Sequence, residues 1–192
     1  MKKILIGTHN QGKFKEIAYL ISGKFKKISP IKLKFRSPKE TGKTFSSNSK
    51  LKVNFFSKFV KFPVICDDSG LCIKALKNKP GIHSARLARK KGGFLSAMQF
   101  ILKQLKEKKS RSAVFICNLS YKDESGKIVS VEGKINGKIS YKILGKKGFG
   151  YDPIFIPINK KITFGQMNKL KKIKMDHRFI AFKKLKKKIK TL

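Results

Sequence analysis

Acidic residues are scarce in this sequence. The 192 residues include 10 Asp and Glu against 48 Lys and Arg, which gives a formal net charge of +38. Such an excess suggests a nucleic-acid partner, because clustered basic residues release counterions from a phosphate backbone. The lysines are, however, spread from Lys2 to Lys190 instead of being gathered in one segment. Lys, Phe and Ile all have A/T-rich codons, so a mutational bias would produce much of this composition, and we expect only weak, non-specific polyanion binding.

Cysteines and long apolar runs are also few. Cys66, Cys72 and Cys117 form no CxxC pair, which predicts free thiols and neither a disulfide framework nor a thiolate zinc site. The three histidines lack the spacing of a metal site. No stretch approaches the roughly 20 apolar residues of a membrane span, and the apolar part of the N-terminus is too short for a signal peptide. We therefore expect a cytoplasmic protein with no membrane partner.

The pattern of apolar residues predicts an α/β fold. Helical spacing covers residues 14–21, 46–60, 95–105 and a basic segment from about 168. Strand-like runs cover residues 3–7, 31–35, 64–66, 71–75, 113–121, 127–135 and 139–143, with Gly126 and Gly137 in turns. We expect one domain over residues 1–192, with a mixed β-sheet flanked by helices and two lobes around a central nucleotide-binding cleft.

Two common site motifs are incomplete. Gly42-Lys43-Thr44 resembles the end of a P-loop, but Ser37 stands where that pattern needs its first glycine. Neither Ser69 nor Ser84 lies in the GxSxG context of a serine hydrolase. The sequence therefore favours neither class.

The remaining acids are more informative. Glu40, Asp67, Asp68 and Asp152 lie in segments rich in Gly, Ser, Thr or Pro, and the pair Asp67-Asp68 is predicted on a turn between two strands. Hard carboxylate oxygens suit Mg²⁺, which binds one or two carboxylates together with substrate phosphates. Simpler alternatives exist, since Asp67 could cap a turn, Asp152 could initiate one and Glu40 could pair with a lysine. Glu16, in contrast, is expected on a solvated helix face.

Three further segments could bind a ligand. The loop Thr8–Lys13 leads from a strand into a helix, whose N-terminal N–H groups would suit a phosphate. Phe149-Gly150-Tyr151 combines aromatic faces with a glycine, as a base-binding platform requires, although a core aromatic turn explains it equally well. His177-Arg178 could donate to a base or phosphate, or lie on a solvated helix face.

These motifs, in this order, resemble the inosine triphosphate pyrophosphatase family. The resemblance implies hydrolysis of ITP, dITP and XTP to the monophosphate and pyrophosphate, with Mg²⁺ as cofactor and a homodimer as the assembly. It covers most of the chain and depends on Thr8–Lys13, Glu40-Thr41-Gly42, Thr44-Phe45, Asn48, Asp67-Asp68-Ser69-Gly70-Leu71, Pro80-Gly81, Ser84-Ala85-Arg86, Gly148–Phe155 and His177-Arg178.

The resemblance also implies the roles of single residues. Glu40 and Asp68 would be the metal ligands, and Asp68 would also be the catalytic base. Ser47 and Asp176 depart from the family pattern, which usually has a glutamate and a serine there. Two alternatives stay open: a basic nucleic-acid-binding protein, and a family member that binds nucleotide with reduced turnover. The implied substrate-binding residues are Thr8, His9, Asn10, Gln11, Gly12, Lys13, Ser69, Phe149, Gly150, Tyr151, Asp152, Lys172, His177 and Arg178.

Overall fold

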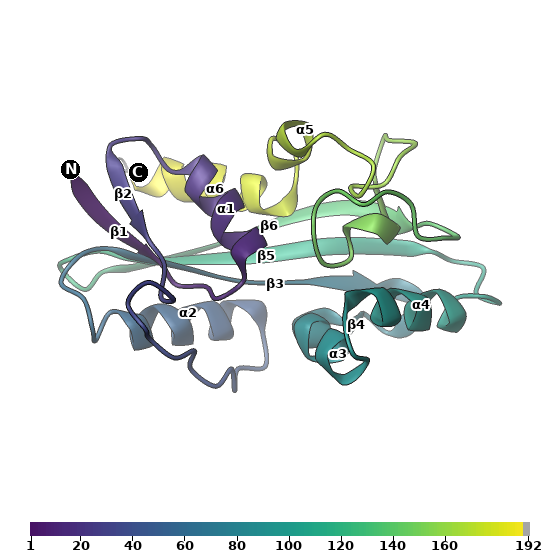
Figure 1. Ribbon diagram of the computed structural model, residues 1–192, viewed down its shortest axis with the longest axis horizontal. Coiled ribbons are helices and arrows are strands. Elements are labelled where there is room, and N and C mark those ends of the chain that lie inside the picture. The colour runs from purple at the N-terminus through teal and green to yellow at the C-terminus, as the bar shows by residue number, and fades with distance from the viewer. Residues whose placement is uncertain (190–192) are drawn as a thin grey trace. The chain divides into compact units, whose positions relative to one another are not determined.

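The computed structural model describes residues 1–189, within which seven strands form one mixed sheet (Figure 1). The hydrogen-bonded order is β2-β1-β3-β5-β6-β7, and β4 pairs with β3. The strands are β1 (Lys2–Ile6), β2 (Phe25–Ile28), β3 (Val64–Ile73), β4 (Lys79–Pro80), β5 (Ser112–Lys122), β6 (Ile128–Ile139) and β7 (Phe155–Pro157). The helices are α1 (Gln11–Leu20), α2 (Phe45–Phe56), α3 (Ser84–Lys90), α4 (Phe94–Gln104), α5 (Lys169–Ile173) and α6 (His177–Lys188). The α/β class with a mixed sheet is confirmed.

The chain consists of two compact units. The first unit comprises Met1–Asp68, Cys117–Gly133 and the segment from Arg178 onward, and the second comprises Ser69–Ile116 and Lys134–His177. Strands β3, β5 and β6 contribute residues to both units. The single-domain assignment and the central cleft stay predictions.

The first unit is a layered structure, because its strands alternate apolar side chains between two faces. Ile4 and Ile6 of β1 pack in a cluster with residues of α1 and α6, such as Ile17 and Leu185. Leu5, between them in the sequence, packs instead with residues of α2, such as Phe56. Figure 1 shows α1 and α6 together on one side of β1 and α2 on the other. Both faces of these parallel strands are therefore covered, which agrees with their continuous apolar sequence.

The second unit contains α3, α4 and α5 together with the short strands β4 and β7. Its core includes three phenylalanines in mutual contact, with ring centroids 4.5 Å apart for Phe115 and Phe155 and 5.4 Å apart for Phe155 and Phe164. Within residues 1–189, no helix combines the length and the apolar content needed to cross a bilayer.

Three predicted elements are wrong. No strand covers residues 31–35, because residues 30–34 form turns, with Leu33 N–H donating to Pro30 O and Lys34 at a φ of 55°. The strand lies earlier, at β2. Gly137 lies inside β6, where it pairs with Pro157 and where a Cβ would overlap Phe155, so no separate strand covers 139–143. The predicted turn at Asp67–Gly70 is part of the continuous strand β3.

Candidate active site

Strand β3 carries Asp67 and Asp68 in adjacent positions, and both side chains are buried. Because successive side chains of a strand point to opposite faces, the two carboxylates have different surroundings. Ile65, two residues before Asp67, belongs to the cluster with α1 and α6, whereas Cys66, two residues before Asp68, belongs to the cluster with α2. The two carboxylates therefore lie on opposite faces of β3, with Asp67 on the side of α1 and α6 and Asp68 on the side of α2.

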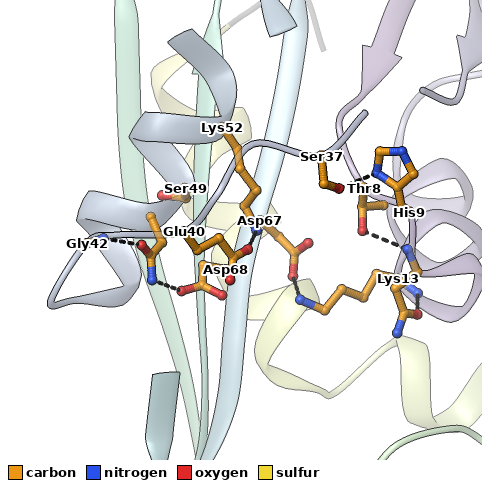
Figure 2. A network of polar contacts seen from close by, with 12 residues as sticks. Thr8, His9, Lys13, Ser37, Glu40, Gly42, Ser49, Lys52, Asp67 and Asp68 are labelled. Carbon is orange, nitrogen blue, oxygen red and sulfur yellow. Dashed lines mark hydrogen bonds and ion pairs between the residues drawn. The ribbon is translucent and has the colours of Figure 1, made fainter. Parts of the chain in front are cut away.

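Asp67 is paired with basic side chains of α1 and α6. Its Oδ2 lies 3.0 Å from Lys13 Nζ and 3.7 Å from Arg178 Nε (Figure 2 shows the Lys13 pair). Arg178 also donates to Glu16 Oε2 at 2.8 Å, and both side chains are buried. The expectation that Glu16 is solvated is therefore wrong, and Asp67 does not cap a turn.

Asp68 faces α2, where the fully buried Asn48 donates from Nδ2 to Asp68 Oδ2 at 3.0 Å. The other end of the same amide, Oδ1, accepts the Gly42 N–H at 2.8 Å. Because a backbone N–H can only donate, the orientation of the amide is determined, and its NH₂ group must point to Asp68. A Cβ on residue 42 would overlap Asn48 and Ser47, so glycine is needed there. Asn48 thus connects the segment that carries Glu40 with Asp68.

Lys52 also belongs to this cluster of charged side chains, although the sequence motifs did not predict it. Its side chain is almost completely buried, and its Nζ lies 2.7 Å from Glu40 Oε1. Figure 2 shows Lys52, Glu40 and Asp68 close together, so the two acids that were predicted to act jointly lie in one site. The signal was available, because position 52 falls on the same helical face as the buried Phe45, Asn48 and Phe56. A lysine on such a face is rarely buried without a partner.

The protein shifts the pKa values of Asp67, Asp68 and Lys52 in different directions from their ordinary values. Burial raises the pKa of Asp67, but Lys13, Arg178 and Lys52 more than offset this and hold it well below its usual range. Burial also raises the pKa of Asp68, where Lys52 and Lys13 do not offset it fully and Glu40 raises it further. Burial would lower the pKa of Lys52, but the surrounding carboxylates raise it. The charge of Asp67 is therefore well compensated, and that of Asp68 is less so.

The predicted phosphate loop, Thr8–Lys13, leads from β1 into α1 as expected. Asn10 caps the helix, with its Oδ1 accepting the Lys13 N–H at 3.0 Å. The His9 ring lies between two groups of the segment before Glu40: Nε2 donates to Phe35 O at 2.8 Å, and Nδ1 accepts from Ser37 Oγ at 2.6 Å. His9 therefore anchors that segment, and a contact between its side chain and substrate stays a prediction.

The N-terminus of α2 is held at several points. Thr44 and Ser47 form a capping box, with Ser47 N–H donating to Thr44 Oγ1 at 3.0 Å and Thr44 N–H donating to Ser47 Oγ at 3.0 Å. Ser49 donates to Asn118 Oδ1 at 2.6 Å and lies 2.7 Å from Ser120 Oγ. Ser47, which departs from the family pattern, thus has a structural role, and the backbone around Asn48 is fixed on both sides.

The second unit contains the predicted base-binding residues except Arg178, which belongs to the first unit, and three of them contact one another. Asp152 Oδ2 accepts from Lys172 Nζ at 2.6 Å and from the Phe149 N–H at 2.8 Å. Lys172 Nζ also lies 4.5 Å from the centroid of the Phe149 ring. Gly148 has a φ of 75°, and a Cβ there would overlap Asp152. Asp152 thus holds the half-buried Phe149 and the buried Lys172 in fixed positions.

The other predicted residues of this unit are more deeply packed. Tyr151 is buried and its hydroxyl donates to Ser84 O at 2.9 Å, as a core aromatic turn would. His177 is buried and stacks on Phe115, with ring centroids 4.8 Å apart. Ser69 is half-buried on β3, followed by Gly70, where a Cβ would overlap Gly81 O. Contacts of these residues with a substrate stay predictions.

The donor set around Glu40 and Asp68 fits Mg²⁺ only in part. Both offer hard carboxylate oxygens, and Figure 2 shows the two side chains near each other. Within residues 1–189, however, no group of three or more His, Cys, Asp and Glu could hold a metal ion by itself. Two carboxylates suit an ion that takes its other ligands from phosphates and water. The residues therefore fit a Mg²⁺ ion shared with a polyphosphate.

The fold and the site define an α/β protein that places lysines and carboxylates where a metal-bound polyphosphate could bind. The sequence pattern of the Ham1 family matches residues 4–188, and the chain belongs to that family. It is 40% identical over 186 residues to a dITP/XTP pyrophosphatase of Caulobacter vibrioides, with 96% of each chain covered. It is 39% identical over 191 residues to a dITP/XTP pyrophosphatase of Dictyoglomus thermophilum, covering 95% of this chain and 92% of that one.

A solved structure shows the same fold. The HAM1 protein of Coxiella burnetii superimposes with a TM-score of 0.88 at 30% identity, and the match covers 100% of both chains. The family resemblance seen in the sequence is therefore confirmed.

Proposed function

We propose that this chain hydrolyses deaminated purine nucleoside triphosphates, namely ITP, dITP and XTP, to the monophosphate and pyrophosphate, and that the reaction requires Mg²⁺. One observation carries the proposal: Lys13 and Lys52 lie in ion-pair contact with Asp67 and Glu40, next to Asp68, in one unit. The names of the relatives, dITP/XTP pyrophosphatase, support the substrate class. Such an activity would remove deaminated purines from the nucleotide pool before a polymerase uses them.

The first unit supplies the groups that would bind the triphosphate. The first turn of α1 follows the Asn10 cap, and helix N-termini present N–H groups that suit phosphate oxygens. Lys13 lies in this turn and extends to Asp67. A phosphate chain bound there would meet the ammonium groups of Lys13 and Lys52, which offset the negative charge that develops as the bond between the first and second phosphates breaks.

Asp68 is the residue that would activate water. In this assignment it accepts a proton from the attacking water or orients that water, while Asn48 holds its Oδ2 in place. Glu40 and Asp68 would hold Mg²⁺, which, when bound, neutralises phosphate charge and orients the triphosphate. Asp67, whose carboxylate is engaged by Lys13, would position that lysine.

Selection among bases would come from Phe149 and Lys172. Phe149 offers an aromatic face, and the buried Lys172 offers N–H donors beside it. A 6-oxo purine can accept such a donor, whereas the 6-amino group of adenine would leave a buried donor facing another donor. A site built in this way rejects the mismatched base strongly.

The substrate preference can be measured as pyrophosphate release from ITP, XTP, GTP and ATP at matched concentrations, with Mg²⁺ present or chelated. We expect kcat/KM for ITP and XTP to exceed that for ATP by at least about 100-fold, because an unpaired buried donor opposes adenine. Equal values for ITP and ATP would contradict the base selection. Turnover that persists in excess chelator would contradict the metal requirement.

The proposal also includes a homodimer in the cytoplasm, with no specific nucleic acid and no membrane as partners. These points depend on the resemblance of the sequence to its family. Sedimentation equilibrium on the full chain would test the dimer.

A further inference from the structure

The position of Lys52 has a consequence for metal binding. Its ammonium group lies among three carboxylates: it contacts Glu40 Oε1 at 2.7 Å and also interacts electrostatically with Asp67 and Asp68. Lys52 comes from the middle of α2, whose start is held by the capping box and by the Ser49 contacts. The lysine therefore enters the carboxylate cluster from a fixed backbone.

The three carboxylates do not have the same partners. Asp67 contacts Lys13 and Arg178 on the side of α1 and α6. Asp68 accepts a hydrogen bond from the neutral amide of Asn48. Glu40 is in direct ion-pair contact with Lys52. At least one of the two proposed metal ligands is thus already bound to a cation of the protein itself.

A divalent ion and the Lys52 ammonium would compete for Glu40. Two cations that approach the same carboxylate repel each other, and within a protein this repulsion is weakly screened. Within residues 1–189, no further Asp, Glu, His or Cys completes a metal-binding group around these acids. Such competition would weaken metal binding to the free protein unless another anion pairs with the Lys52 ammonium.

We propose that Lys52 is the resident counter-ion of Glu40, that it leaves Glu40 for the phosphates of the nucleotide, and that Mg²⁺ and nucleotide consequently bind together. A triphosphate supplies both the anion that Lys52 needs and the oxygen ligands that the metal site lacks. The flexible four-carbon stem of lysine permits this exchange of partners without movement of α2. This inference depends on the metal ligands assigned in the proposed function.

Metal binding without nucleotide tests the proposal directly. Mn²⁺, a spectroscopic substitute for Mg²⁺, would be titrated into native protein and into Lys52→Met, with bound and free ion counted by electron paramagnetic resonance. We expect Lys52→Met to bind Mn²⁺ at least about tenfold more tightly, because one positive charge is removed next to Glu40. An affinity equal to that of the native protein would overturn the proposal.

Two control variants separate the local charge from other effects. Lys50→Met removes a lysine from the exposed side of the same helix and should leave Mn²⁺ affinity unchanged. Lys52→Arg keeps the positive charge and should also show no gain. A gain in either control equal to that of Lys52→Met would overturn the assignment of the effect to the Lys52 charge.

A measurement on native protein covers the case in which Lys52→Met does not fold. Protein-bound Mn²⁺ would be measured with and without imidodiphosphate, an analogue of pyrophosphate that resists hydrolysis, after correction for the complex between the two. We expect imidodiphosphate to tighten Mn²⁺ binding and Mn²⁺ to tighten imidodiphosphate binding by the same factor, as linkage requires. Independent binding would overturn the proposal. Because both experiments measure binding, their results hold whether or not the chain releases pyrophosphate from ITP.

Discussion

Replacing Asp68 with asparagine is expected to lower kcat for pyrophosphate release from ITP by about 10²–10⁴-fold, the usual contribution of a general base. The amide cannot take a proton from water and is a poor substitute for a carboxylate metal ligand. The hydrogen bond from Asn48 can be kept, since the side-chain oxygen of the introduced amide would still accept it. Burial raises the pKa of Asp68, so folding does not stabilise its charged form, and removal of that charge should leave the variant stable.

The rate of Asp68→Asn would be compared with that of Asp123→Asn, which changes an aspartate in the turn between β5 and β6. The control should retain native kcat, because Asp123 accepts hydrogen bonds from Ser125 and Lys127 and lies outside the carboxylate cluster. Native turnover in Asp68→Asn would contradict the catalytic assignment. A comparable loss in Asp123→Asn would show that the effect does not belong to the site.

Replacing Asp67 with asparagine should instead destabilise the fold, by about 3–5 kcal/mol in the free energy of unfolding. Asp67 is fully buried, and its carboxylate is the partner of Lys13 at 3.0 Å. In this variant the ion pair between Arg178 and Glu16 would remain, but the Lys13 ammonium would lose the carboxylate that it contacts. Breaking one side of a buried ion pair costs far more than the pair contributes at a surface, because the remaining charge stays desolvated.

Urea unfolding followed by circular dichroism would measure this loss, with Asp68→Asn as the matched variant one residue away. Asp68→Asn should unfold near the native midpoint, whereas Asp67→Asn should unfold at a clearly lower urea concentration with a similar slope. Equal midpoints for the two variants would contradict the division of roles between the adjacent acids.

The site shows what a sequence can and cannot predict. Thr8–Lys13 was correctly expected between a strand and a helix, because the helical spacing of Phe14 and Ile17 locates the start of α1. Glu40 and Asp68 were expected in one site, and Figure 2 shows their side chains near each other. Both predictions depend on local patterns or on motifs that are specific in combination.

The environment of the two acids could not be predicted from local patterns. Ser69 and Gly70 suggested a turn, but Gly70 lies in a strand because it allows close approach to Gly81 O. Turn preference is a local tendency, and tertiary packing overrides it here. The pairing of Glu16 with Arg178 joins residues 162 positions apart, which no local periodicity reveals. Helical spacing places Lys52 on the face of Asn48 and Phe56, but it does not reveal Glu40 as the partner of the lysine.

The products formed from ITP by the native chain test the central claim most directly. Chromatography after complete turnover should show IMP and pyrophosphate in equal amounts, formed in the presence of Mg²⁺ and not after chelation, because the site is expected to cleave between the first and second phosphates. IDP with inorganic phosphate, or no turnover at all, would contradict it.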